Sequence, residues 1–366
     1  MNAQTAYSTK PLPDAVADLR GQLRGLKPKA AVFFASSDYD TAALSRQVRS
    51  AFPDACIAGC TTAGEIAGRM LTGSVAGIFL DDEIVEDAAA AVVEDLGAGI
   101  DLGDPFARLE GHFRAPRSAW DREKYVGLVL VDGLSGAEER LMEKLGDATD
   151  IFFVGGAAGD DLKFKATHVW AGGEAHTDSA VLMLLRLRRG FEIMKAQSFR
   201  STGKSLVATA ADEARRTVIE FNHKPALEAY AEVLGLPPAE APGRFFSHPL
   251  GLMVRGEPFV RSPQRADGSS IVFYCQIKQG MKLDVLEATD IVADTRRALE
   301  ARKGVAGEIR GLIEFQCILR TLQLRQEKRC QEYEALFAGI PTAGFSTYGE
   351  EYLGHMNQTS TMLLFR

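Results

Sequence analysis

Long apolar runs, an excess of positive charge and an even number of cysteines are all missing from this sequence of 366 residues. No stretch reaches the roughly 20 apolar residues that a membrane helix needs, so we expect no membrane insertion. The N-terminus lacks the basic start and apolar core of a secretory signal, and we expect a cytoplasmic protein. Asp and Glu (49) outnumber Lys and Arg (42), giving a net charge of −7 that argues against general binding to nucleic acid.

Cysteine is scarce and odd in number. The five residues are Cys56, Cys60, Cys275, Cys317 and Cys330. This is not a disulfide framework, and we expect thiols, of which at most one is redox-sensitive. Cys56 and Cys60 form one Cys-x-x-x-Cys pair, but a structural zinc needs four ligands and no second Cys/His pair lies nearby. We therefore expect no zinc site.

Complete enzyme signatures are absent as well. The stretch STGKS at residues 201–205 resembles the end of a phosphate-binding loop, but Ser198 stands where that loop needs glycine. The sequence contains neither H-E-x-x-H nor G-x-S-x-G. Because no catalytic constellation is complete, we do not expect an enzyme.

The chain has the composition of a globular protein, with 46% hydrophobic and 25% charged residues, and its length suggests about two domains. A strand, a helix and a second strand at residues 30–60 predict parallel pairing. Later segments alternate meander strands with helices, which predicts an α/β (mixed α+β) fold of two modules with mixed sheets covered by helices. We expect an N-terminal tail and helix over residues 1–27, with residues 1–10 disordered, and modules at residues 28–222 and 223–366.

One histidine has surroundings that suit a ligand. His248 lies in RFFSHPLGLM, and Pro249 restricts its backbone to extended conformations. Phe246 and Met253 can supply an apolar wall, and Arg244 is placed to meet a carboxylate. An imidazole in an apolar pocket beside a cation suits haem iron and its propionates. The other interpretation is a half-buried histidine at the start of a strand.

Two Gly-Glu pairs follow Thr-rich segments, at Glu65 and at Glu350. In one interpretation these are turns, each with a buried and hydrogen-bonded glutamate. In the other, Glu65, Tyr348, Glu350 and Asn357 form a ligand pocket where the two halves meet. For Glu350 we favour a structural role, with backbone amides and Arg320 as its partners.

These motifs together resemble the FIST family, with an N-terminal and a C-terminal FIST module. The matching stretches cover nearly the whole chain: PDACIAGCTTAGEIAG (53–68), VGGAAGDD (154–161), HPLG (248–251), FQCILR (315–320), and AGFSTYGEEY (343–352) continuing to NQTST (357–361). The resemblance implies a sensory input protein of bacterial signal transduction.

The same resemblance extends to NosP-type haem-binding nitric oxide sensors. It implies His248 as the haem iron ligand, within the cofactor site of Arg244, Phe246, Pro249 and Met253. It also implies a separate partner such as a histidine kinase or a cyclic-di-GMP enzyme, and we allow for a homodimer. The alternative is a haem-free sensor of a small ligand such as an amino acid.

Overall fold

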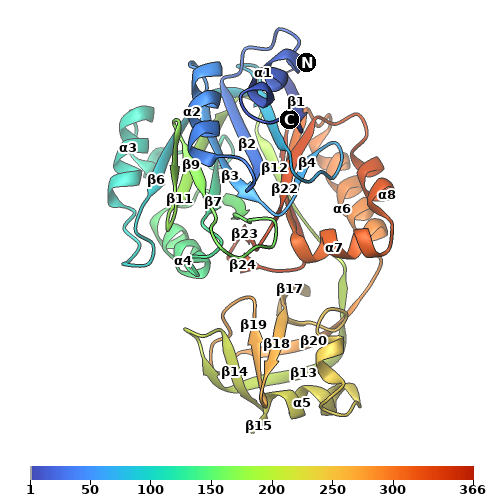
Figure 1. The fold of residues 1–366 in the computed structure, drawn as a ribbon. Coiled ribbons are helices and arrows are strands. Elements are labelled where there is room, and N and C mark those ends of the chain that lie inside the picture. Colours follow the sequence, from blue (N-terminus) through green and yellow to red (C-terminus); the bar gives the residue numbers. More distant parts are fainter. Residues whose placement is uncertain (1) are drawn as a thin grey trace. The chain divides into compact units, whose positions relative to one another are not determined.

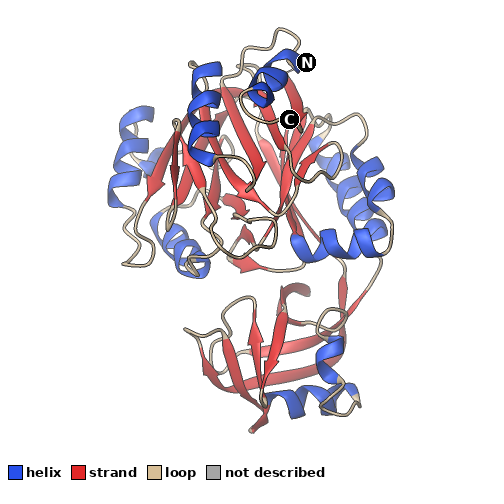
Figure 2. Cartoon of the chain, in the orientation of Figure 1, coloured by secondary structure: helices blue, strands red, loops and turns tan. Residues whose placement is uncertain are grey.

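The computed structural model describes residues 2–366 and divides into two compact units (Figures 1 and 2). Unit 1 contains the chain up to Lys195, Arg296–His355 and Ser360–Arg366, and unit 2 contains Ala196–Thr295 and Met356–Thr359. Both combine strands with helices, which confirms the predicted mixed α/β class. Each unit is built from separate segments of the chain: residues 196–222 lie in unit 2, and Arg296–His355 returns to unit 1.

Unit 1 consists of three copies of one arrangement. Each copy has an outer strand, a helix, a first core strand, a helical connection, a second core strand, a short crossing strand and a closing strand. Copy 1 is β1 (Ala3–Ser8), α1 (Asp14–Gln22), β2 (Ala30–Ser36), α2 (Thr41–Ala51), β3 (Cys56–Thr62), β4 (Glu65–Ala67) and β5 (Val75–Leu80). Copy 2 is β6 (Val85–Val93), α3 (Gly103–Phe113), β7 (Tyr125–Val131), α4 (Glu138–Ala148), β8 (Phe153–Ala157), β9 (Val169–Ala171) and β11 (Ala180–Leu187), with the extra strand β10 (Glu174–His176).

Copy 3 is interrupted in the sequence by unit 2. It comprises β12 (Phe191–Gln197), α6 (Ile291–Ala306), β21 (Gly311–Cys317), α7 (Ile318–Gln326), α8 (Cys330–Glu334), β22 (Thr342–Thr347), β23 (Glu350–Tyr352), β24 (His355–Met356) and β25 (Thr359–Phe365).

The three copies build three sheets with the same central order. The sheets run β1-β5-β2-β3-β9-β10, β6-β11-β7-β8-β23-β24 and β12-β25-β21-β22-β4. In each sheet the two core strands are parallel, and the closing strand lies antiparallel to the first core strand. The parallel pairing predicted for residues 30–60 is therefore confirmed, and it recurs twice.

The short crossing strands exchange partners in a cycle. Each follows the second core strand of its own copy but pairs with the second core strand of another: β4 with β22, β23 with β8, and β9 with β3. An uncovered core strand would leave a row of unpaired backbone groups. Each copy therefore satisfies backbone groups that belong to a neighbour.

Apolar side chains from all three sheets form one shared core. Phe34 of β2 stacks on Phe345 of β22 with ring centroids 4.9 Å apart, and Phe315 of β21 packs edge-on against the same ring at 5.9 Å. Leu128 and Met183 of copy 2 belong to the same buried cluster. The core of unit 1 thus joins segments more than 300 residues apart.

The N-terminal segment corrects one expectation. Residues 3–8 form strand β1 rather than part of a disordered tail, and this strand pairs antiparallel with β5. Ala3 and Ala6 are buried, so small side chains allow the strand to lie close against the core. The helix expected within residues 1–27 is present as α1.

Unit 2 has its own sheet and core. Its strands are β13 (Phe199–Asp212), β14 (Thr217–Phe221), β15 (Lys224–Pro225), β16 (Leu250–Val254), β17 (Glu257–Arg261), β18 (Pro263–Asp267), β19 (Ser270–Phe273) and β20 (Lys282–Ala288). They pair in the order β17-β16-β20-β13-β14-β19-β18, with β15 on β14. Helix α5 (Ala226–Leu234) contributes Tyr230 to a buried cluster with Phe221 and Phe273.

A glycine between core strands provides a test of the close packing. A Cβ at Gly155 of β8 would lie 1.7 Å from the backbone oxygen of Val129 in β7, so Gly155→Ala requires the strands to separate. We expect this substitution to lower the free energy of unfolding by about 3 kcal/mol or more. Gly111→Ala is the control, because nothing lies within 4 Å of that Cβ position in α3, and alanine there should stabilise by about 0.5–1 kcal/mol. Chemical denaturation measures both; equal effects of the two substitutions would contradict the close contact.

Candidate functional site

The second core strand of each copy ends in a turn of the same form. The sequences are Thr62-Ala63-Gly64-Glu65 (turn 1), Ala157-Ala158-Gly159-Asp160 (turn 2) and Thr347-Tyr348-Gly349-Glu350 (turn 3). The acid at the end of each turn is buried: Glu65 and Asp160 are each 1% exposed and Glu350 is 0% exposed. Carboxyl ends of parallel strands are the common location of ligand sites in α/β sheets.

Backbone hydrogen bonds join the three turns in a ring. Turn 1 is linked to Ser346, the residue just before turn 3, by Ala63 N to Ser346 O (3.0 Å) and Ser346 N to Gly64 O (2.7 Å). Turns 3 and 2 are linked by Tyr348 N to Ala157 O (3.1 Å) and Ala157 N to Gly349 O (2.8 Å). Gly159 N and Asp161 N donate to Thr61 O and Thr62 O at 3.0 and 2.9 Å, which links turn 2 to turn 1. A shift in one turn must therefore disturb the other two.

The carboxylate of turn 1 is enclosed by hydroxyl groups. Glu65 accepts hydrogen bonds from the hydroxyl of Thr62, from Ser74 N at 3.0 Å and from Ser74 Oγ at 2.5 Å. Burial raises the pKa of Glu65, and the bonds from Ser74 and Thr62 only partly oppose that rise. These contacts match a structural role for Glu65 in fixing the turn.

The carboxylate of turn 2 organises a loop. Asp160 accepts from Tyr348 Oη of turn 3 at 2.6 Å. It also accepts from three successive backbone N–H groups, those of Phe164 (2.8 Å), Lys165 (2.5 Å) and Ala166 (3.1 Å). Burial alone would raise the pKa of Asp160, but the bonds from Tyr348 and the three amides outweigh it, and the pKa lies below its usual value.

The loop that Asp160 holds, residues 160–166, is strained and exposed. Asp161, Leu162 and Phe164 have φ of 56°, 63° and 51°, in the left-handed region that non-glycine residues rarely adopt. Phe164 is 59% exposed although its ring stacks on Tyr348 with centroids 5.0 Å apart. Backbone strain of this kind persists where surrounding contacts impose it and is concentrated at functional sites.

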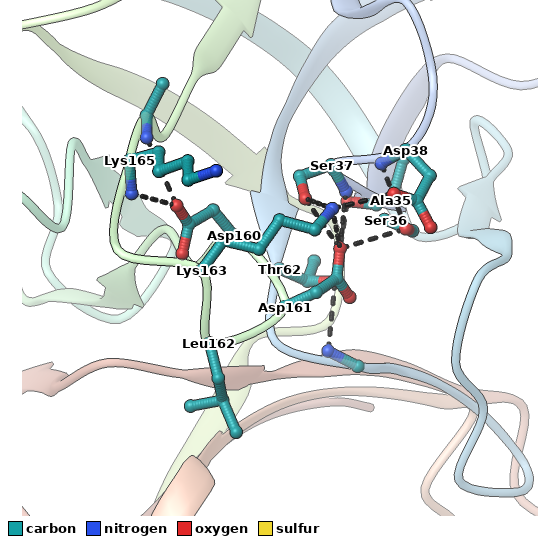
Figure 3. Close-up of polar contacts among 12 residues, drawn as sticks. Ala35, Ser36, Ser37, Asp38, Thr62, Asp160, Asp161, Leu162, Lys163 and Lys165 are labelled. Carbon is teal, nitrogen blue, oxygen red and sulfur yellow. Dashed lines mark hydrogen bonds and ion pairs between the residues drawn. The ribbon is translucent and has the colours of Figure 1, made fainter.

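Opposite charges gather beside this loop (Figure 3). Asp161 Oδ2 accepts from Ser36 Oγ (2.9 Å), Ser37 N (2.8 Å) and Ser37 Oγ (2.7 Å) at the end of β2. Lys163 Nζ lies 2.6 Å from Asp38 Oδ1, 2.8 Å from Ser37 Oγ and 3.8 Å from Asp161 Oδ2. The side chains of Asp161, Lys163 and Asp38 are 20%, 40% and 71% exposed, so a solvent ligand can reach them. We call Ser37, Asp38, Asp161 and Lys163 the charged rim.

The predicted pocket residues fall into two groups. Glu65, Tyr348 and Glu350 lie in the hydrogen-bonded turns, where Glu65 and Glu350 occupy equivalent positions of copies 1 and 3. Asn357 is buried in unit 2 and is not part of these turns. The sequence interpretation omitted Asp160, Asp161 and Lys163 from the pocket, although the same x-Gly-acid pattern after an apolar strand identifies Asp160.

The predicted haem ligand lies in unit 2 just before β16. His248 is half-buried, and its Nδ1 lies 2.9 Å from Ser247 Oγ. Burial, followed by the Arg244 charge, lowers the pKa of His248, which favours neutral imidazole. Phe246 is 38% exposed, whereas Pro249 is buried and Met253 packs beside a small apolar cluster.

The cysteines and acids of residues 2–366 form no metal centre. No group of three or more His, Cys, Asp or Glu side chains in this part of the chain is arranged to hold an ion. All five cysteines are free. Burial raises the pKa of Cys56 to about 12 and that of Cys60 well above its usual value, so neither is a reactive thiolate at neutral pH.

Comparison with known families matches this architecture to a class of sensor. The FIST N domain matches residues 29–224, which hold the core strands of copies 1 and 2, and the FIST C domain matches residues 226–352. The chain belongs to the FIST family, as its motifs predicted, and these domains indicate a sensory signal-transduction protein that binds a small ligand. No curated protein matches the chain. Within residues 2–366, no helix has both the length and the apolar character required to span a bilayer.

Asp160→Asn tests how the charged carboxylate organises the loop. The amide keeps the shape but replaces one acceptor oxygen by a donor, so we expect the free energy of unfolding to fall by about 2–4 kcal/mol at pH 7. Because the pKa of Asp160 is depressed in the folded state, its contribution is present above its usual value of 3.8 and is lost as the pH falls below it. The difference between variant and wild type should therefore shrink in acid.

Denaturation curves at several pH values measure this, and Asp54→Asn on an exposed turn is the control. A loss of stability that is the same at pH 3 and pH 7 would show that the charge of Asp160 is not responsible.

Proposed function

We propose that this FIST protein senses a small zwitterion of the amino-acid type at the charged rim of unit 1. The observation that carries the proposal is the exposed arrangement of two carboxylates and one ammonium beside the strained loop 160–166. An ammonium group of a ligand suits Asp38 and Asp161, and its carboxylate suits Lys163 and the hydroxyl of Ser37. Exposed ion pairs contribute only about 0–1 kcal/mol, so a ligand can replace the internal pair at small cost.

The surroundings supply a route from ligand to signal. Lys163 lies within the loop that Asp160 holds through three amides, and Asp160 is bonded to Tyr348 of turn 3. A ligand that draws Lys163 outward acts on a loop whose three left-handed residues keep their conformation only through the contacts around them. Exposed Leu162 and Phe164 then provide the surface that changes. A histidine kinase or a cyclic-di-GMP enzyme, the partner class implied by the family resemblance, is the proposed receiver.

Lys163→Gln tests the ligand site. Wild-type protein titrated with the standard amino acids should show a rise in melting temperature with at least one of them, and none with the corresponding amine that lacks the carboxylate. Lys163→Gln should weaken binding at least tenfold because it removes the carboxylate partner. Lys165→Gln is the control, since Lys165 is exposed in the same loop and only its backbone N–H holds Asp160. Equal loss in both variants would refute the assigned role of Lys163.

A second candidate is haem-based sensing of nitric oxide through His248. The specific observation is the contact between Ser247 Oγ and the imidazole Nδ1 of His248. A hydrogen bond at Nδ1 orients an imidazole so that it can bind a metal through Nε2. His248 would hold the iron, Arg244 would meet a propionate, and Phe246 and Met253 would supply apolar contacts to the haem. Haem bound through a single histidine supplies an open iron position for a diatomic gas.

Haem titration of the purified protein tests this candidate. Wild type should develop an intense Soret band at one haem per chain, and His248→Ala should lose it or shift it strongly. His223→Asn is the control: it removes another imidazole of unit 2, and asparagine tolerates the φ of 61° at that position. A Soret band unchanged by His248→Ala would exclude this residue as the ligand.

A further inference from the structure

A basic cleft lies in unit 1 at the amino ends of the core strands, opposite to the ends that carry turns 1, 2 and 3. It has a volume of about 630 Å³, within the usual range for small-molecule sites. The segment before β7, the turn between β11 and β12, helix α6, and the ends of β23 and β25 form its walls. Its cationic lining residues are Arg122, Lys124, Arg188, Arg189, Arg302 and Arg366, against the two acids Glu123 and Glu192.

Some of these cations have partners and others do not. Glu192 pairs with Arg366 and, at 3.4 Å, with Arg302, while Arg188 donates to the backbone oxygen of Asp82. The side chains of three exposed residues have no hydrogen bond or ion pair within residues 2–366: Arg122, Lys124 and Arg189. The Nε of Arg366 is buried and likewise lacks a hydrogen-bond partner in this part of the chain.

The repeated architecture shows that the fold does not require this charge. The turn from closing strand β5 to outer strand β6 is equivalent to the turn from β11 to β12. The first carries Asp81, Asp82 and Glu83, whereas the second carries Arg188 and Arg189. In a chain with a net charge of −7, such a local excess of cations is a focus for anions.

Aromatic side chains complete the cleft. Phe152, which is 38% exposed, and half-buried Tyr352 lie side by side with ring centroids 6.3 Å apart, and Phe191 also contributes to the lining. The backbone beneath is fixed by Leu187 N donating to Lys124 O at 2.8 Å and Arg366 N donating to Gly190 O at 3.4 Å. A cleft with guanidinium groups and partly exposed rings suits a ligand with both phosphates and a planar base.

We propose that this cleft binds a nucleotide, with its phosphates held by Arg122, Arg189 and Lys124 and its base against Tyr352 and Phe152. This site is separate from the charged rim, and its test does not depend on the proposed function. An acidic peptide of a partner protein lacks a planar base, and the test distinguishes it.

Calorimetric titrations use ATP, tripolyphosphate, adenosine and hexaglutamate as probes, without divalent cations, at low and at physiological ionic strength. ATP should bind, its affinity should fall as salt is added, and both tripolyphosphate and adenosine should bind at least fivefold more weakly. Absence of ATP binding at millimolar concentration would overturn the proposal. Equal affinity for ATP and tripolyphosphate would remove the base-binding role, and tighter binding of hexaglutamate would assign the cleft to a protein segment.

Two variants locate the site. Arg189→Glu should weaken ATP and tripolyphosphate alike by tenfold or more, and Tyr352→Leu should weaken ATP alone. Arg46→Glu, at an exposed position of α2 away from the cleft, changes the net charge by the same amount as Arg189→Glu. It should leave the affinity for ATP within about twofold of wild type. An equal loss in Arg46→Glu would show that ATP responds only to overall charge, which would refute the cleft as its site.

Discussion

Backbone pairing between each second core strand and a crossing strand from another copy is the constraint on which unit 1 depends. Strand β3 is flanked by β9, β8 by β23 and β22 by β4, so each edge is covered by a segment whose own copy lies elsewhere in the ring. Because the crossing strands are short, the turn before each must lie close to the turns of the other copies. The hydrogen-bonded ring of turns 1, 2 and 3 follows from this exchange.

Burial of an acid at each of these turns has an energetic consequence. A carboxylate removed from water is costly unless hydrogen bonds replace its hydration. Glu65 and Asp160 receive those bonds from different sources, Glu65 from hydroxyls and an amide within copy 1, and Asp160 from its own loop and from Tyr348 of copy 3. The equivalent positions have therefore diverged: one anchors a turn locally, while the other couples an exposed loop to a neighbouring copy.

Part of this architecture was readable from the sequence. The alternation of apolar strands and amphipathic helices predicts the mixed α/β class. The strand, helix and strand of residues 30–60 predict the first parallel pair. Both predictions hold because hydrophobic period and spacing depend on local structure. The Gly-Glu pairs at Glu65 and Glu350 pointed to related turns. Turn 2, which ends at Asp160, differs from these two in sequence, since aspartate replaces glutamate and alanine replaces threonine there.

Other features depend on long-range contacts that no local pattern encodes. The segment of residues 3–8 is short and polar, which suggests a tail. It is nevertheless a strand, because it pairs with β5. The interruption of copy 3 by unit 2 hides the threefold repeat, because about 100 residues separate β12 from the rest of its copy. The pairing of Asp161 with Ser36 and Ser37 joins positions about 125 residues apart in the sequence.

The exchanged strands also bear on how the two family modules relate to folding. A fragment limited to the FIST N match would retain β3, β8 and β9 but lose β22 and β23, which cover β4 and β8. Its exposed strand edges would be templates for association with other chains. Strand pairing thus crosses the boundary between the two matched modules. During synthesis, β4 and β8 remain without these partners until β22 and β23 have been made.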